Sequence, residues 1–214
     1  MSIELTSQIY ANYLEKVSQV IKENKEYVTS LDSVTGDGDH WVNINMGFEN
    51  ILKEIENLKT MPIYQVFKKM GMVMMSKIGG SSGILYGGAY IAASKALDGK
   101  ESLNSEDICT MLKVMVEDMM NRGKAEPGFK TMIDSLYPAA KKYEECLAQG
   151  KEDKETLQSV KKAAIDGAQS TMNMESVKGR ASYREDKGVG HLDPGAITMS
   201  YQIESLCDTL IEKI

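Results

Sequence analysis

Apolar side chains recur at every third or fourth position in eight stretches of this 214-residue chain, and this period constrains the fold more than any other feature. The spacing places apolar groups on one face of an α-helix. Few segments alternate with the period of two that half-buried β-strands require. The pattern therefore predicts an all-α fold, with helices over residues 9–21, 44–58, 63–74, 83–97, 108–119, 133–147, 157–168 and 196–210.

Composition and charge exclude several classes of protein. The chain carries 25 basic and 31 acidic residues, a net charge of −6, whereas proteins that bind nucleic acid through its phosphates are usually basic. It has no run of about 18 apolar residues, so we expect no membrane span. Residues 1–16 lack the basic and apolar regions of a signal peptide. No long linker or internal repeat interrupts the sequence, so we expect one domain over residues 1–214.

The three cysteines indicate a compartment. Cys109, Cys146 and Cys207 are odd in number and far apart, and no C-x-x-C pair occurs. A disulfide framework or a thiolate zinc site is therefore not expected. Buried, reduced thiols are typical of a cytoplasmic protein, and the cytoplasm is the location we predict.

Methionine is abundant, with 15 residues, and aromatic residues make up only 7% of the chain. Methionine at helical spacing usually packs in a core, because its flexible side chain fills irregular gaps. The alternative is a soft interior that tolerates a cavity or an apolar ligand, and the sequence does not decide between the two.

The first of four unusual stretches between the predicted helices is acidic. Residues 32–41 contain Asp32, Asp37 and Asp39 with two glycines interleaved. Three carboxylates this close repel one another unless a cation neutralises them, and clustered oxygen ligands suit Mg²⁺ or Ca²⁺. The stretch lacks the later glutamate and the spacing of an EF-hand. The alternative is a solvated acidic turn, or aspartates that cap a helix beginning near residue 42.

The second stretch is rich in glycine and serine. Residues 79–83 read Gly-Gly-Ser-Ser-Gly, and a helix that begins just after them would offer free backbone N–H groups to an anion. The stretch is neither a Walker A loop nor the G-x-G-x-x-G turn of dinucleotide-binding folds. The alternative is a flexible turn followed by close helix packing at Gly87 and Gly88.

The third and fourth stretches, residues 122–128 and 178–195, are basic and rich in glycine. Their candidate ligands are Arg122, Lys178, Arg180 and His191. Basic loops complement an acidic metal loop when the ligand is a polyphosphate, because the metal and the cations share its oxygens. The alternatives are ordinary surface charge for the cations and a satisfied loop histidine. Together the four stretches predict one site for Mg²⁺ and a nucleotide at one end of a helical barrel.

Five segments are similar to the signatures of one family. They are Gly36–Trp41, Gly79–Gly87, Arg122–Met132, Gly179–Tyr183 and Gly190–Ala196. On these residues the chain resembles the nucleotide-binding L subunit of bacterial dihydroxyacetone kinases across essentially its whole length. The resemblance implies a single-domain antiparallel barrel or bundle of eight helices, with the nucleotide site at one rim.

The resemblance also implies which residues bind the ligands. Asp32, Asp37 and Asp39 would hold two Mg²⁺ ions. Met132 would contact adenine instead of filling the core. The implied ligands of ADP or ATP are His40, Trp41, Val42, Asn43, Ser81, Ser82, Gly123, Met132, Arg180, Asp193, Pro194 and Gly195.

The implied activity is transfer of a phosphoryl group to dihydroxyacetone, with Arg180 and His40 as candidate catalytic residues. Arg180 would stabilise the charge of the transition state. In the family a separate K subunit holds dihydroxyacetone through a histidine, so neither histidine of this chain is expected to anchor the substrate. The family's free-standing L subunits keep ADP as a resident coenzyme, which a phosphohistidine M subunit of the phosphotransferase system rephosphorylates. We therefore expect K and M subunits as partners, with a homodimer as an open possibility.

The chain departs from the family pattern at several positions. Trp41 stands where the family has glycine, so its ring is expected to stack on the nucleotide or to crowd it. Ser81, Ile84, Gly88 and Leu192 replace alanine, proline, threonine and glutamine. Three alternatives stay open: an ATP-using subunit for a related short ketose, a protein similar to fatty-acid kinases, and a nucleotide sensor that regulates a partner without catalysis.

Overall fold

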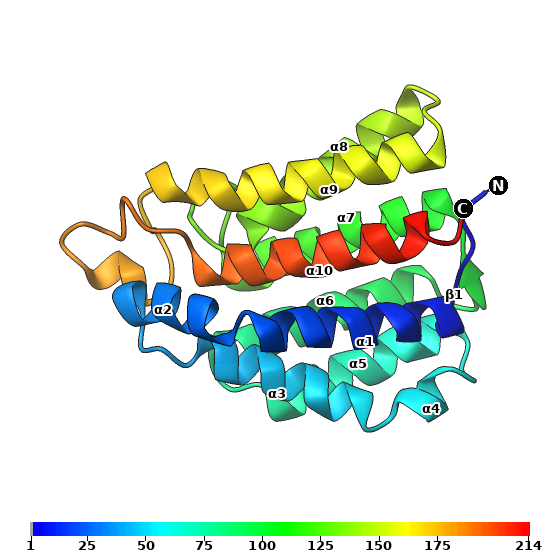
Figure 1. The fold of residues 1–214 in the computed structure, drawn as a ribbon, viewed down its shortest axis with the longest axis horizontal. Coiled ribbons are helices and arrows are strands. Elements are labelled where there is room, and N and C mark those ends of the chain that lie inside the picture. The colour runs from blue at the N-terminus through cyan, green and yellow to red at the C-terminus, as the bar shows by residue number, and fades with distance from the viewer. Residues whose placement is uncertain (1) are drawn as a thin grey trace.

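A computed structural model describes residues 2–214, which form a ring of long helices (Figure 1). The long helices are α1 (Ser7–Glu23), α3 (His40–Leu52), α5 (Ile63–Lys77), α6 (Gly80–Ala96), α7 (Ser105–Gly123), α8 (Ile133–Ala148), α9 (Asp153–Ser170) and α10 (Pro194–Ile211). Each packs against the next of these along the chain, and α10 packs back on α1, which closes the ring. The prediction of an all-α barrel of eight helices is confirmed.

Several short elements were not predicted separately. They are α2 (Lys25–Thr35), α4 (Ile55–Leu58), the 3₁₀ helices η1 (Thr171–Asn173) and η2 (Arg180–Tyr183), and the strands β1 (Leu5–Thr6) and β2 (Ser102–Leu103). Helix α2 buries only Val28, Asp32 and Thr35, so it carries no apolar stripe that a periodicity argument could find. The stripe expected over 44–58 is interrupted at residues 53–54, which separate α3 from α4.

Glycines permit the closest helix contacts in the ring. A Cβ atom at Gly71 of α5 would lie 2.8 Å from the carbonyl oxygen of Gly87 in α6. A Cβ at Gly88 would overlap the Arg122 guanidinium on α7. The interpretation of Gly87 and Gly88 as close-packing positions is therefore correct.

The interior is packed with aromatic residues and methionines. Tyr10 meets Phe67 edge to face with ring centroids 5.1 Å apart, and Phe67 stacks on Tyr90 at 6.4 Å. Met70 and Met74 are fully buried in the same cluster. Core packing is thus the role of these two methionines.

The antiparallel order of the helices decides where the connections lie. Residues 36–39, 78–79, 124–132 and 171–193 connect helices at one end of the ring, where α2 also lies (Figure 1). Both chain ends lie at the opposite end. All four unusual stretches are therefore brought to a single rim. Within residues 2–214, no helix combines the length and apolarity that crossing a bilayer requires.

Candidate functional site

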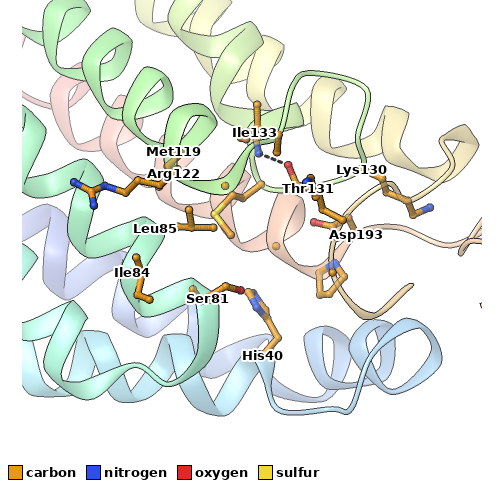
Figure 2. A pocket seen from close by; sticks show the side chains of 18 residues that line it. His40, Ser81, Ile84, Leu85, Met119, Arg122, Lys130, Thr131, Ile133 and Asp193 are labelled. Atoms are coloured by element: carbon orange, nitrogen blue, oxygen red, sulfur yellow. Dashed lines mark hydrogen bonds between the residues drawn. The ribbon is translucent and has the colours of Figure 1, made fainter. Parts of the chain in front are cut away.

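Two adjoining cavities open at this rim, with volumes of about 470 Å³ and about 230 Å³. The larger has an apolar wall formed by α6, α7 and the start of α8, and the smaller is lined by the acidic stretch (Figure 2). Residues that line both are His40, Ser81, Ser82, Lys178, Gly179, Asp193 and Pro194. The two cavities therefore form one continuous site with an apolar part and an acidic part.

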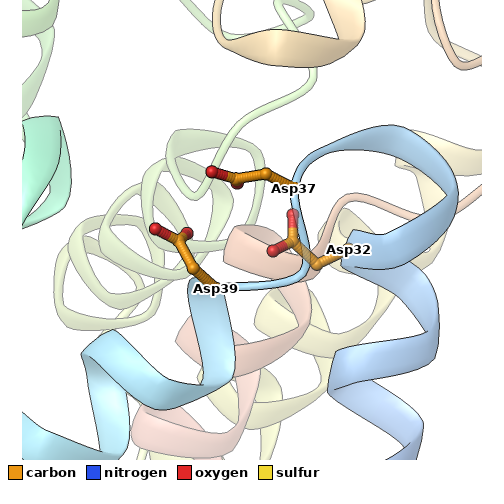
Figure 3. Close-up of side chains that lie close together, drawn as sticks. All are labelled: Asp32, Asp37 and Asp39. Carbon is orange, nitrogen blue, oxygen red and sulfur yellow. The ribbon is translucent and has the colours of Figure 1, made fainter.

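Three carboxylates converge in the acidic part (Figure 3). Asp32 comes from the last turn of α2, Asp37 from the following loop and Asp39 from the residue before α3. One oxygen of each lies within 4.8 Å of the others. Ligands on opposite sides of a Mg²⁺ ion are separated by about 4 Å, and carboxylate oxygens are the ligands that this ion prefers. The cluster therefore suits a hard divalent cation.

The interleaved glycines make this convergence possible. A Cβ at Gly36 would overlap a carboxylate oxygen of Asp32, so any side chain there would displace the carboxylate. Gly38 has a φ of +78°, which favours glycine. The backbone N–H of His40 donates to Asp32 at 2.9 Å, which fixes the buried carboxylate at the start of α3.

Arg180 is the cation that meets the cluster. Its guanidinium lies 2.6 Å from the Asp37 carboxylate, and its side chain is two-thirds exposed. An exposed pair of this kind is weak, of the order of 1 kcal/mol or less. Arg180 is therefore free to exchange Asp37 for another anion at little cost.

The other basic stretch supplies no such cation. The Arg122 guanidinium is paired with Asp118 at 2.5 Å, and Figure 2 shows it directed away from His40 and Asp193. Arg122 still lines the larger cavity together with Gly123 and Ala125, so a role for this residue in holding a polyphosphate stays a prediction.

The start of α6 provides backbone donors between the two parts of the site. Gly79 precedes the helix and lies next to Asn43 of α3. The side-chain oxygen of Asn43 would lie 3.5 Å from a Cβ atom at Gly79. No side chain caps this helix, so its first-turn N–H groups are free of a capping acceptor. Ser81 and Ser82 add hydroxyl donors in that turn. Such a helix start binds phosphate groups well.

His40 is positioned by a hydrogen bond to α10. Its Nε2 lies 2.8 Å from the hydroxyl of Thr198, which also lies 3.2 Å from the carbonyl oxygen of Gly195. Burial lowers the pKa of His40, although the nearby carboxylates of Asp32 and Asp39 partly oppose this effect. Burial therefore favours the neutral form of the ring.

Asp193 caps the start of α10. Its carboxylate accepts from the N–H of Ala196 at 2.7 Å, and Pro194 occupies the first turn. Burial raises the pKa of Asp193 to about 7, against the effects of that hydrogen bond and of Lys130.

Most predicted site residues line one of the two cavities. These are Asp32, Asp37, Asp39, His40, Asn43, Ser81, Ser82, Gly123, Met132, Arg180, Asp193, Pro194 and Gly195.

Trp41 and Val42 line neither cavity. The Trp41 indole donates to the carbonyl of Ile21 at 2.8 Å and lies under the ammonium of Lys25, so it neither stacks in nor crowds the site. The side chain of Val42 is exposed, and contact through the backbone stays a prediction for both positions.

Lys130 lies at the site without having been predicted. Its side chain is buried, and its ammonium donates to carbonyl groups of the 171–193 segment. A lone lysine in a loop is usually a solvated charge, so its residue type gave no reason to expect burial. The only signal in the sequence was its position within the segment Arg122–Met132.

Comparison with known proteins identifies the family. A model of the DAK2 domain matches residues 34–208 of the chain. The chain belongs to the DAK2 family. The L-subunit resemblance of its five segments is thereby confirmed at the level of the family.

Relatives of this DAK2 domain cover nearly its whole length. It is 34% identical over 206 residues to "PEP-dependent dihydroxyacetone kinase, ADP-binding subunit DhaL" of Escherichia coli, covering 96% of this chain and 97% of the relative. It is also 34% identical over 206 residues to "PTS-dependent dihydroxyacetone kinase, ADP-binding subunit DhaL" of Lactococcus lactis, covering 96% and 99%. Among solved structures, the dihydroxyacetone kinase of C. freundii in complex with AMP-PNP and Mg²⁺ is similar at a TM-score of 0.71 and 26% identity. That match covers 92% of this chain and 33% of the longer one.

Replacing Asp37 tests the carboxylate cluster. We expect Asp37→Ala to weaken binding of Mg²⁺ and ADP by about 100-fold, which corresponds to about 3 kcal/mol, because one of the three candidate carboxylate ligands of the cation is lost. Helix content should not change, since the side chain is partly exposed and pairs only with Arg180. Calorimetric titration and circular dichroism measure both quantities. Glu185→Ala removes the same charge from the exposed neighbouring loop and should bind normally; wild-type affinity in Asp37→Ala would contradict the cluster's role.

Asp193 makes stability depend on pH in the ligand-free protein. Its raised pKa means that its contribution to stability is fully present below the pKa of the unfolded chain and is lost as pH rises through about 7. An asparagine at this position cannot titrate and caps a helix equally well. We therefore expect Asp193→Asn to exceed the wild type in unfolding free energy by about 2–4 kcal/mol at pH 8, with a much smaller gap at pH 4.5. Urea unfolding at both pH values measures the gap, and a gap that does not change with pH would disprove the shift.

Proposed function

We propose that this chain is the Mg²⁺- and ADP/ATP-binding subunit of a dihydroxyacetone kinase, and that it transfers a phosphoryl group to dihydroxyacetone held on a separate K subunit. The observation that carries the proposal is the convergence, at one rim, of the three carboxylates, the uncapped start of α6 and an apolar cavity. These are the parts needed to bind a metal, a polyphosphate and a base side by side. Membership of the DAK2 family supports the same function.

The three carboxylates are our candidates for holding two Mg²⁺ ions. When bound, the ions would neutralise phosphate charge and so favour attack on the phosphoryl group. Asp32 is fixed by the His40 amide, whereas Asp37 is held only by the exposed Arg180 pair. Asp37 and Asp39 can therefore adjust to ligands while Asp32 anchors the cluster.

The nucleotide would span both parts of the site. The amides of Trp41 and Val42, those of residues 80–82 and the hydroxyls of Ser81 and Ser82 would bind the phosphates, since they lie at helix starts beside the carboxylates. His40 and Asn43 would contact the nucleotide through their side chains, because their amides donate to Asp32 and Asp39. The base would lie in the larger cavity against Met132 and Gly123. Asp193 and Pro194 line both cavities, and Gly195 lines the larger one. These three residues would therefore contact the middle of the nucleotide.

Arg180 and His40 are our catalytic candidates. Arg180 would leave Asp37 for the transferred phosphoryl group and stabilise its charge in the transition state. Burial favours the neutral form of His40, so we propose that it orients a ligand by hydrogen bonding and does not supply positive charge. Neither residue is proposed to hold dihydroxyacetone.

We propose resident ADP, rephosphorylated by a phosphohistidine M subunit, as the source of the phosphoryl group. Support comes from relatives of nearly equal length whose names read "PEP-dependent" or "PTS-dependent" and "ADP-binding subunit". The K and M subunits are then its partners, and the cytoplasm is its location, in line with the free thiols of its three cysteines. A homodimer stays a prediction.

Mass spectrometry of the purified and denatured chain tests the coenzyme proposal. We expect about one ADP for each chain without added nucleotide, since a resident coenzyme must survive purification. A vacant chain that binds ATP reversibly with Mg²⁺ would favour an ATP-using subunit. A chain that binds neither nucleotide with Mg²⁺ would contradict the proposed function.

Replacing Arg180 tests its use in the transition state. We expect Arg180→Ala to lower the rate of dihydroxyacetone phosphorylation with a K-type subunit by about 100-fold or more, and to weaken nucleotide binding much less. Lys187→Ala removes a positive charge from the same segment and should keep its rate, because Lys187 is exposed, pairs with Glu175 and lines neither cavity. A loss confined to binding would show that Arg180 is not used selectively in the transition state.

A further inference from the structure

Lys130 is a buried charge that the proposed chemistry does not use. Its side chain is only 2% exposed, although an ammonium group strongly prefers water. A buried charge is tolerated only where it is paired or fully hydrogen-bonded. The contacts of its ammonium group therefore show what this residue does.

The ammonium binds a ring of backbone carbonyl groups. Nζ lies 2.7 Å from the oxygen of Thr171, 2.6 Å from that of Gly188 and 2.5 Å from that of His191, with the oxygen of Met174 at 3.3 Å. An ammonium has three N–H donors, so the three short contacts use all of them. Two of the four carbonyls come from the beginning of the 171–193 segment and two come from its end.

Lys130 thus closes the base of the segment that connects α9 to α10. Backbone hydrogen bonds strengthen the same closure, from the N–H of Gly190 to Met172 at 2.8 Å and from Ser176 to Lys187 at 2.9 Å. Between the two ends lie Lys178, Gly179 and Arg180, which line the smaller cavity. The end of the segment carries Asp193.

Direct contact with phosphate is not the role of this lysine. Figure 2 shows its side chain pointing away from His40 and Ser81 on the facing wall of the cavity. Its donors are already occupied by the carbonyls. Its charge still acts at short range, because Lys130 counteracts the rise in the pKa of Asp193 and Asp193 in turn opposes the lowering of the lysine pKa by burial.

We propose that Lys130 is a positioning residue, whose buried ammonium fixes the 171–193 segment so that Arg180 is held at the carboxylate cluster and residues 193–195 at the cavity wall. The proposal rests on the function proposed above. Lys130 also belongs to the 124–132 connection, which carries Met132. One side chain therefore joins the two connections that would enclose the nucleotide.

Other side chains cannot replace this contact. Methionine matches the lysine side chain up to the ε position but lacks the ammonium group, so it would leave the buried carbonyls without donors. Arginine presents a planar fork of five donors, which does not match carbonyls converging on one point. Glutamine retains two donors and no charge, so it should preserve part of the closure.

Hydrogen exchange measures the closure without any ligand. In Lys130→Met, we expect the amides of Ser176 and Gly190 to exchange about 10-fold faster or more, because the segment opens locally. Calorimetry should show binding of Mg²⁺ and ADP weakened about 10- to 100-fold, since misplaced groups lose that much. The phosphorylation rate at saturating nucleotide should fall by a further 10- to 100-fold, that is by about the loss expected for a misplaced Arg180. Lys130→Gln should lie between Lys130→Met and the wild type in all three.

Two controls separate positioning from general stability. Lys187→Met removes an exposed lysine of the same segment and should change each quantity by less than about twofold. Leu210→Ala destabilises the far end of α10 through a buried cavity and should leave exchange at Ser176, nucleotide affinity and rate unchanged.

The outcomes are distinct. Normal affinity and rate in a folded Lys130→Met, or equal losses in Leu210→Ala, would overturn the proposal. If Lys130→Met does not fold, wild-type behaviour of Lys130→Gln would overturn it. If the wild-type chain binds no Mg²⁺ and ADP, the proposed function is contradicted instead. If hydrogen exchange is unchanged in the Lys130 variants, the lysine does not hold the segment closed, and the proposal is overturned.

Discussion

Three carboxylates held within 4.8 Å of one another repel, and the rest of the site is arranged around that repulsion. The chain can keep them together because the His40 amide holds Asp32, because Gly36 leaves room for that carboxylate and because Arg180 pairs with Asp37. Because a divalent cation would relieve this repulsion, the cluster favours cation binding. The antiparallel ring then places the uncapped start of α6 beside the cluster, since every second connection reaches the same rim.

The site also divides its positive charges between two tasks. Arg180 is exposed, weakly paired and able to move, whereas Lys130 is buried and bound on all sides. Arg122 lines the larger cavity, but its guanidinium is paired with Asp118 on its own helix. Burial and hydrogen bonding thus distinguish three cations that the sequence alone does not separate.

Periodicity predicted the eight long helices because each needs an apolar face toward the ring interior. It could not find α2, whose few buried residues include Asp32 and Thr35, or the break between α3 and α4. Spacing placed the carboxylates and the glycine-rich turn correctly, since both depend on local sequence. The direction of Trp41 and the burial of Lys130 were not predictable, because each depends on carbonyls far away in sequence, at Ile21 and in the 171–193 segment.

The position of the two chain ends has a consequence for how such a module can be combined with others. Both lie at the end of the ring opposite the site (Figure 1). A polypeptide fused to either end would leave the mouth of the site accessible to a docking protein. The same fold can therefore act as an independent subunit or as a tethered part of a larger enzyme, as in the C. freundii kinase, where the similar region is a third of the chain.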